Sequence, residues 1–246
     1  MSHLFKPYMK YAPFHFKKFS IFQEGVSHPV GTDGVLLGAW ADVLGVHTVL
    51  DIGTGTGLVA LMLAQRSVPG ALITAIDLHP GSVACARRNM WQSPWRDNLA
   101  VVEIPVQQYA LETTLRFDLI VSNPPFFSDL TVSPDGERSL GRHTGTLSTG
   151  DLLEAVLRLL KPTGRFCLVL PYKEGKRLCE MAVPLGLYCT YEVEVRSRAG
   201  KQVERLLLQL ERDPRCFRRE GLDIYDLEGG YSAAYRRLTG DFYLKG

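Results

Sequence analysis

The sequence predicts an α/β fold: a doubly wound, mostly parallel sheet of seven strands whose last strand is antiparallel. Two patterns predict it. From residue 48 onward, short apolar runs alternate with longer segments of helical apolar spacing, which is typical of repeated βα units. The final two apolar runs are separated only by a short basic turn, which indicates an antiparallel addition at the sheet edge. With 246 residues, the chain is long enough for one such domain.

Strands are expected where apolar and β-branched residues form short runs, at 48–52, 71–76, 99–104, 117–122, 164–170, 187–195 and 203–210. Helices are expected where apolar residues recur at helical spacing, at 58–65, 79–90, 151–160 and 173–183. Ser148 or Thr149 is expected to cap the third helix, because a hydroxyl there accepts from the first turn. Residues 1–45 are predicted to form an N-terminal extension packing on the main domain, residues 46–246. A polar loop at 127–147 is long enough to indicate a functional or disordered segment.

Composition narrows the class of protein. The net charge of +2 is too small to indicate nucleic-acid binding by itself. The five scattered cysteines include no Cys-x-x-Cys pair, which argues against a zinc ribbon and favours a reduced, cytoplasmic protein without a metal site. Residues 1–6 lack the apolar core of a signal peptide, and no apolar run approaches the length of a membrane span.

A glycine-rich segment, Asp51-Ile52-Gly53-Thr54-Gly55-Thr56-Gly57, follows the first expected strand and opens the first helix. Glycines permit a tight turn and close approach of backbone N–H groups to a ligand. Asp77 ends the second strand, where an acid meets ribose hydroxyls in dinucleotide-binding folds. Together these features predict an adenosine-containing cofactor. The alternative for Asp77 is the N-cap of the helix that starts near His79.

A second motif, Asn123-Pro124-Pro125-Phe126, follows the strand at 117–122. Two prolines exclude a helix and further ladder pairing, so an amide and an aromatic ring are expected at the carboxyl end of a strand. Open α/β sheets bind ligands at that edge. The simpler alternative is a proline-stiffened turn.

The spacing of the glycines, G-x-G-x-G, departs from the dinucleotide fingerprint G-x-G-x-x-G. It resembles the first motif of class I S-adenosylmethionine-dependent methyltransferases, which have a Rossmann-like fold. The resemblance implies that Gly53, Gly55 and Gly57 approach the methionine and adenosine portions of S-adenosyl-L-methionine. It also implies that Asp51 supports the methionine amino group and that Asp77 takes the ribose hydroxyls.

The second motif is similar to the N-P-P-Y/F motif of methyltransferases acting on planar amide-like or exocyclic nitrogens. Such a nitrogen is a poor nucleophile, because its lone pair is delocalised into the ring. The Asn123 side-chain carbonyl and the Pro124 backbone carbonyl can accept from adenine N6 and orient it. Phe126 can stack on the target ring. We therefore predict catalytic roles for Asn123, Pro124 and Phe126, and a cofactor contact for Asn123.

Several segments along most of the chain resemble the bacterial tRNA1(Val) (adenine(37)-N6)-methyltransferase family. They are 16–21, which matches a short basic-aromatic strand, and 28–40, 142–144, 147–148, 235–238 and 241–244. The resemblance implies methylation of adenine 37 in the anticodon loop of tRNA1(Val). Carried over by position, Thr32 and Asp33 contact the methionine end of the cofactor. The alternative for Asp33 is a helix N-cap, a role that is compatible with the contact.

Other functions remain open at this point. The same motif is found in glutamine-N5 methyltransferases acting on release factors and in rRNA or DNA adenine-N6 methyltransferases. A cofactor-binding protein without catalysis and a nucleotide-binding oxidoreductase are alternatives of a different class. The intact Asn123-Pro124-Pro125-Phe126 motif argues against the first of these two, and the G-x-G-x-G spacing against the second.

A tRNA partner requires cations that neutralise phosphates. Lysines interleave with aromatic residues in the first twenty positions, a mixture that suits single-stranded RNA, although the aromatics can equally pack inward as a strand. The predicted RNA contacts are Lys17, Lys18, Arg142, Arg196, Arg198 and Lys201. The segment from Arg212 to Glu220 mixes arginines with acids and is interpreted as a solvent-facing charged surface. The protein is expected to be a monomer.

Overall fold

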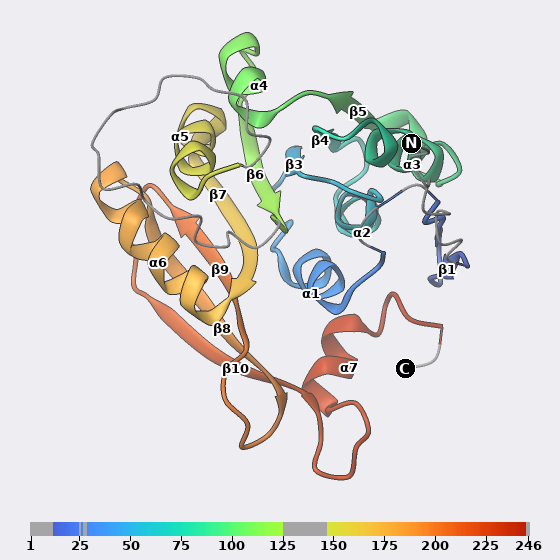
Figure 1. Cartoon of the computed structure of the whole chain (residues 1–246), viewed down its shortest axis with the longest axis vertical. Helices are drawn as coiled ribbons and strands as arrows, with labels where there is room; N and C mark the ends of the chain where they lie inside the picture. Colours follow the sequence, from blue (N-terminus) through green and yellow to red (C-terminus); the bar gives the residue numbers. More distant parts are fainter. Residues whose placement is uncertain (1–11, 25, 27–28, 125–146, 245–246) are drawn as a thin grey trace, which may run out of the picture.

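The computed structural model describes residues 12–24, 26, 29–124 and 147–244. Phe126, Arg142 and the 127–146 part of the predicted loop therefore lie outside the described residues. The structure is an α/β sandwich around one large sheet, with helices on both faces (Figure 1). Among the described residues, no helix is both long enough and apolar enough to cross a membrane.

The sheet has eight strands in the order β10-β8-β9-β7-β6-β3-β4-β5. Their bounds are β3 (Thr48–Ile52), β4 (Leu72–Asp77), β5 (Leu99–Glu103), β6 (Phe117–Ser122), β7 (Leu160–Pro171), β8 (Tyr188–Arg198), β9 (Arg205–Glu211) and β10 (Arg218–Tyr225). All neighbours pair in parallel except β9, which is antiparallel to both β7 and β8. The mostly parallel, doubly wound sheet and its antiparallel strand are confirmed.

Two details of the predicted sheet are wrong. The count is eight rather than seven, because Arg218–Tyr225 adds a strand parallel to β8. The antiparallel strand does not lie at the edge, because β9 inserts between β7 and β8. The side chains of β9 explain this placement: Leu206, Leu207, Leu208 and Leu210 are fully buried, so both faces of the strand require cover.

Seven helices accompany the sheet in the described part of the chain: α1 (Thr32–Trp40), α2 (Leu58–Arg66), α3 (Pro80–Trp91), α4 (Val106–Glu112), α5 (Thr149–Leu159), α6 (Tyr172–Ala182) and α7 (Ala233–Thr239). One hydrophobic cluster joins α4, α5 and α6 to one face of the sheet. A second cluster joins α1, α2 and α7 to the other face (Figure 1). As expected, Ser148 caps α5, and its Oγ accepts from Asp151 N at 3.1 Å.

The two ends of the described chain lie together on the α1–α2 face. The segment predicted as one strand at 16–21 is instead a hairpin of β1 (Phe14–His15) and β2 (Ser20–Ile21), with Lys17 and Lys18 in its turn. The hairpin pairs with the C-terminal segment, since Lys17 N donates to Phe242 O at 2.8 Å. Phe16 and Phe242 are both buried in the second cluster. The domain boundary at residue 45 stays a prediction.

Candidate active site

The glycine-rich loop lies at the carboxyl edge of the sheet, between β3 and α2. Gly53, Gly55 and Gly57 all have left-handed backbone angles, with φ of 71°, 56° and 81°. Side chains other than glycine adopt this region rarely, so the three glycines are required by the turn itself. A Cβ at Gly53 or Gly55 would meet open space, whereas one at Gly57 would press on Ala86 and Met90 of α3. The first two glycines therefore border the open side of the loop, and the third packs α2 against α3.

The amide groups of this loop point mainly into the protein. Gly53 N and Thr54 N donate to Ile76 O at 2.9 and 3.1 Å, and Gly57 N donates to Thr54 O at 2.9 Å. Gly55 N donates to Asp77 Oδ2 at 2.9 Å. These four N–H groups already have partners within the protein, and the approach of Gly53, Gly55 and Gly57 to the cofactor stays a prediction. The loop presents its Cα atoms to the open side, which agrees with a site that holds no pyrophosphate.

Asp77, at the end of β4, accepts hydrogen bonds from the glycine-rich loop and from the residue before α3. Besides the bond from Gly55, its Oδ1 accepts from His79 N at 2.9 Å. The N-cap of α3 is His79, so the N-cap interpretation of Asp77 is wrong. A carboxylate has about four acceptor positions, so each Asp77 oxygen keeps one for a hydroxyl donor.

Asp51 is buried beneath the same loop. Its Oδ2 accepts from Thr54 Oγ1 at 2.7 Å and from Ala60 N, in the first turns of α2, at 3.2 Å. Burial raises the pKa of the Asp51 carboxyl to about 7, with bonds from Thr54 and Ala60 opposing the shift and the charge of Asp77 adding to it. An acid that titrates near neutrality at the mouth of a strand is a candidate functional group.

Asn123 follows β6 directly beside the glycine-rich loop. Ile52 and Ser122, the last residues of β3 and β6, are in register, and Ser122 Oγ donates to Ile52 O at 2.9 Å. The Asn123 side chain is half-buried and makes no hydrogen bond with any described residue. Its Nδ2 lies 3.8 Å from the position a Cβ would take at Gly34. The amide is therefore held close to α1 with its hydrogen-bonding capacity unused there.

The first turn of α1 contributes Thr32 and Asp33 to this edge. The N-cap of α1 is Gly31, so the N-cap interpretation of Asp33 is wrong. Asp33 instead pairs with Arg205, the first residue of β9, at 2.8 Å between Oδ1 and Nη1. Burial raises the pKa of the Asp33 carboxyl, and Arg205 opposes that shift.

Sequence reasoning missed two residues that hold this site. Arg205 was not among the predicted site residues, because its partner Asp33 is far away in the chain. Asn89 of α3, which is 1% exposed, donates to Thr56 O at 2.8 Å and to Phe22 O at 2.9 Å, and accepts from Phe22 N at 2.9 Å. It ties the glycine-rich loop to the N-terminal segment. A polar amide amid the apolar pattern of helix 79–90 was the available signal.

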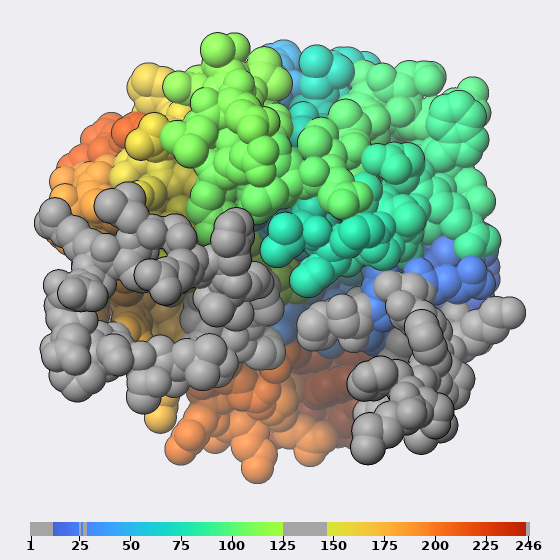
Figure 2. Space-filling view, turned by 45° about the horizontal axis from the view of Figure 1, so that its top comes forward, coloured from blue at the N-terminus to red at the C-terminus, as the bar shows by residue number. Residues whose placement is uncertain are grey.

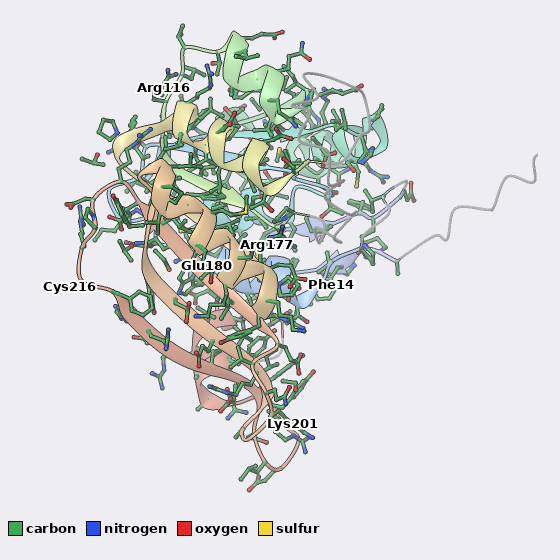
Figure 3. The ribbon with its side chains drawn as sticks, turned by 60° about the vertical axis from the view of Figure 1, so that its left-hand side comes forward. Phe14, Arg116, Arg177, Glu180, Lys201 and Cys216 are labelled. Carbon is green, nitrogen blue, oxygen red and sulfur yellow. The ribbon has the colours of Figure 1, made fainter. Side chains whose placement is uncertain are left out.

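The predicted RNA-contacting residues that the structure describes differ in whether their side chains already have a partner within the protein. Lys17 donates to Gly240 O at 2.5 Å, and Arg196 pairs with Glu194 at 3.0 Å, so both also support the fold. Lys18, Arg198 and Lys201 are exposed and have no ion pair within the described part of the chain. Lys201 lies in the turn between β8 and β9, and Figure 3 shows it at the lower end of the molecule, well below Arg177 and Glu180 of α6.

Comparison with known proteins assigns a family to this arrangement. The methyltransferase small domain family matches residues 35–177. A tRNA1(Val) (adenine(37)-N6)-methyltransferase of Histophilus somni is 42% identical over 231 residues, which cover 94% of this chain and 97% of the relative. An enzyme of the same name from Yersinia enterocolitica is 40% identical, with coverage of 97% and 95%.

A solved structure shares the fold. The crystal structure of a predicted O-methyltransferase from Agrobacterium tumefaciens superposes with a TM-score of 0.66 at 18% identity, covering 85% of this chain and 96% of that one. With the identities above, these matches show that the chain belongs to the methyltransferase small domain family and to the tRNA1(Val) (adenine(37)-N6)-methyltransferases.

Proposed function

We propose that this chain transfers the methyl group of S-adenosyl-L-methionine to N6 of adenine 37 in the anticodon loop of tRNA1(Val). The observation that carries the proposal is the position of Asn123. Its amide lies beside the glycine-rich loop and the first turn of α1, without a hydrogen bond to the described residues. The names of relatives at about 40% identity over nearly the whole chain support the choice of substrate.

The residues at this edge fit the proposed cofactor. Open space above Gly53 and Gly55 leaves room for a ligand against the loop. Asp77 has acceptor capacity left for ribose hydroxyls, and Asp51 supplies a carboxylate for an amino group above pH 7. Thr32 and Asp33, in the first turn of α1, are proposed to border the methionine end. These roles for Thr32, Asp33, Asp51, Gly53, Gly55, Gly57 and Asp77 are part of the proposal.

The cofactor supplies an electrophilic methyl group on a sulfonium. The protein must orient and activate adenine N6, which is a weak nucleophile. The Asn123 Oδ1 and the Pro124 carbonyl oxygen each accept an N–H of the adenine amino group, which points its lone pair at the methyl carbon. The nitrogen would become positive as its bond to the methyl carbon forms and the bond from sulfur to that carbon breaks, and these two acceptors would stabilise the charge until a proton leaves to water. Removing one preorganised polar group of this kind costs about 10²- to 10³-fold in kcat.

The substrate class is tested by incubating the protein with labelled cofactor and, separately, bulk tRNA, rRNA, DNA and a release factor. We expect label in tRNA only, recovered as N6-methyladenosine. Asn123→Ala is expected to lower kcat about 10²- to 10³-fold without unfolding the protein. Asn98→Ala, at the amino end of β5, is the matched control and should keep full activity. Label in the release factor, or an unchanged kcat for Asn123→Ala, would refute the proposal.

The enzyme is proposed to act as a monomer in the cytoplasm, which stays a prediction from the sequence.

A further inference from the structure

Four tyrosines form a row that runs from the end of β10 to the C-terminal segment. The rings of Tyr225 and Tyr231 stack at 5.2 Å with an interplanar angle of 15°. Tyr231 stacks in turn on Tyr235 at 4.8 Å, and the hydroxyls of Tyr235 and Tyr243 lie 3.1 Å apart. Tyr235 is buried, whereas Tyr225 and Tyr231 are each 39% exposed. The inner end of the row is therefore core, and the outer end is a half-exposed aromatic surface.

This outer end projects from the same edge of the sheet as the candidate active site, three to four strands away from β6. Tyr225 is the register partner of Arg198, the last residue of β8. Through the strand pairing, Ser122 of β6 is level with Glu192 of β8. Tyr225 and Arg198 therefore lie six residues further along the strand direction, a distance of about 20 Å. Because β8 and β10 run parallel to β6, this extension projects from the same edge as Asn123. The helix α7, which carries Tyr235, packs against α1 (Figure 1).

Unpaired cations accompany the exposed tyrosines. Arg198 is exposed, and its Nη2 lies 3.8 Å from the position of a Cβ at Gly229, in the turn between Tyr225 and Tyr231. Lys201, Arg236 and Arg237 are also exposed, and the described residues offer none of these cations an ion pair. Of the two acids in the turn, Asp226 and Glu228, the first accepts from Glu228 N and Gly230 N at 3.0 and 2.9 Å and so stabilises the turn. In Figure 2, the orange surface around residue 200 adjoins the red surface of the C-terminal region.

We propose that Tyr225, Tyr231 and Arg198 form a docking surface for unpaired bases and phosphates of the RNA whose adenine reaches Asn123. The inference rests on the proposed function and deepens it by naming the surface that grips the substrate. Single-stranded RNA is held by bases stacked on aromatic rings and by cations on its phosphates. Tyr225 supplies such a ring, since it stacks on one other ring in the described structure and is otherwise half-exposed. Arg198 supplies a positive charge, and its side chain makes no ion pair with the described residues.

The first experiment measures the affinity of the full-length protein for a tRNA1(Val) transcript, by fluorescence anisotropy without turnover. Stacking of one base on an aromatic ring is worth about 1–3 kcal/mol, so Tyr225→Ala should weaken the Kd for tRNA about 5- to 150-fold. Tyr225→Phe keeps the ring and should stay within about twofold of the wild type. The Kd for S-adenosyl-L-methionine should not change in either variant.

The matched control is Phe217→Ala. Phe217 is an exposed aromatic residue that precedes β10, at the other end of this strand from Tyr225. Figure 3 shows its neighbour Cys216 far from Lys201. Phe217→Ala should bind tRNA as the wild type does. If Phe217→Ala weakens binding as much as Tyr225→Ala, the effect is not specific to this surface and the inference is wrong.

The second experiment follows the Kd for tRNA over a range of salt concentrations. Arg198→Ala should reduce the slope of log Kd against log salt by about 0.7 to 1, the contribution of one phosphate contact. Arg158→Ala removes an exposed arginine near the amino end of β7 and should leave the slope unchanged. An unchanged slope for Arg198→Ala would contradict the proposed phosphate contact.

The outcomes separate this inference from the proposed function. A lower melting temperature for Tyr225→Ala with unchanged tRNA affinity would show that the tyrosine row serves packing alone, which overturns the inference. Since binding is measured without turnover, this result is independent of methylation. A wild-type protein that leaves adenine 37 unmodified would refute the proposed function instead.

Discussion

At the scale of single residues, the site depends on side chains that meet across long stretches of sequence. The positions of Asn123 and the glycine-rich loop at the carboxyl ends of strands were predictable, because each belongs to a short motif that follows an apolar strand. The ion pair between Asp33 and Arg205 was not, because a local pattern contains only one partner. For the same reason Lys17, predicted as an RNA contact, could not be recognised as a donor to Gly240 O, 223 residues away.

The Asp33–Arg205 pair is expected to hold the first turn of α1 in place. Both side chains are about three-quarters buried, so Arg205→Ala leaves a carboxylate with little solvent and no counter-ion. We expect a loss of about 1–2 kcal/mol in the free energy of unfolding, and a smaller loss for Arg205→Lys. A double-mutant cycle with Asp33→Asn, measured by urea unfolding, checks the pair. Additive effects of the two substitutions would show that the pair does not couple α1 to β9.

Asp51 predicts a pH dependence of cofactor affinity. The pKa of its carboxyl is raised to about 7, so the group becomes charged, and attractive to an amino group, as the pH rises through 7. The Kd for S-adenosyl-L-methionine, measured by calorimetry, should therefore tighten up to about tenfold between pH 6 and pH 8 through this group. Asp51→Asn should lack that component, which separates it from the titration of the cofactor itself. Identical pH profiles for the two proteins would rule out the role.

The raised pKa of Asp51 also makes the stability of the folded protein depend on pH. The folded-state pKa lies above the ordinary value of 3.8, so the folded protein binds the proton more tightly than the unfolded chain does. The contribution of Asp51 to stability therefore decreases as the pH rises from about 4 to about 7. Asp51→Asn should flatten this part of the stability profile.

At the scale of elements, the positions of the predicted strands are confirmed within a few residues, whereas β10 was missed. Its sequence, Arg-Arg-Glu-Gly-Leu-Asp-Ile-Tyr, is charged in its first half and contains a glycine, so only its last four residues alternate as in a strand. It pairs with only one strand, and ion pairs such as Arg219–Glu192 at 2.8 Å hold it to β8. The interior position of β9 did have a signal, since its leucines are continuous rather than alternating.

The crossing of α1 and α2 depends on the absence of a side chain at Gly38. A Cβ there would lie 2.8 Å from both Cβ and Sδ of Met62. Gly→Ala in a helix ordinarily stabilises by up to about 1 kcal/mol, but crowding of this kind costs about 1–3 kcal/mol. Gly38→Ala should therefore lower the free energy of unfolding, measured in urea, by up to about 2 kcal/mol.

The control is Gly150→Ala in the first turn of α5. The nearest atom to a Cβ at that position is Ser148 Oγ at 3.9 Å, so the new methyl group meets no obstacle. This variant should be stabilised by up to about 1 kcal/mol. If Gly38→Ala is stabilised as well as Gly150→Ala, the contact between α1 and α2 can accommodate a methyl group and the prediction is wrong.

At the scale of the whole molecule, the two ends of the chain close one face of the fold. The general architecture follows from the βα rhythm, but this closure does not, because the residues from 12 to 21 and from 239 to 244 show no pattern that pairs them. It depends on Phe242, which is 1% exposed and lies in the same cluster as Phe16 and the helices α1 and α2.

Phe242→Ala is expected to destabilise the whole domain. Truncation of a fully buried phenylalanine costs about 3–5 kcal/mol, which corresponds to a fall of roughly 6–20 °C in melting temperature for a chain of this size. Leu244→Ala, two residues later and 62% exposed, should leave the melting temperature unchanged. Equal melting temperatures for Phe242→Ala and the wild type, in a calorimetric scan, would show that the C-terminal segment adds nothing to the core.

The central claim is that this chain methylates N6 of adenine 37 in tRNA1(Val) with Asn123 as the amino-group acceptor. The most direct measurement is nucleoside mass spectrometry of tRNA1(Val) transcripts, with adenine or guanine at position 37, after incubation with S-adenosyl-L-methionine and either the wild type or Asn123→Ala. The account predicts N6-methyladenosine only for the adenine-37 transcript with the wild-type protein, and at least about 10²-fold less with Asn123→Ala at equal time. N6-methyladenosine in the guanine-37 transcript, or equal amounts from both proteins, would contradict it.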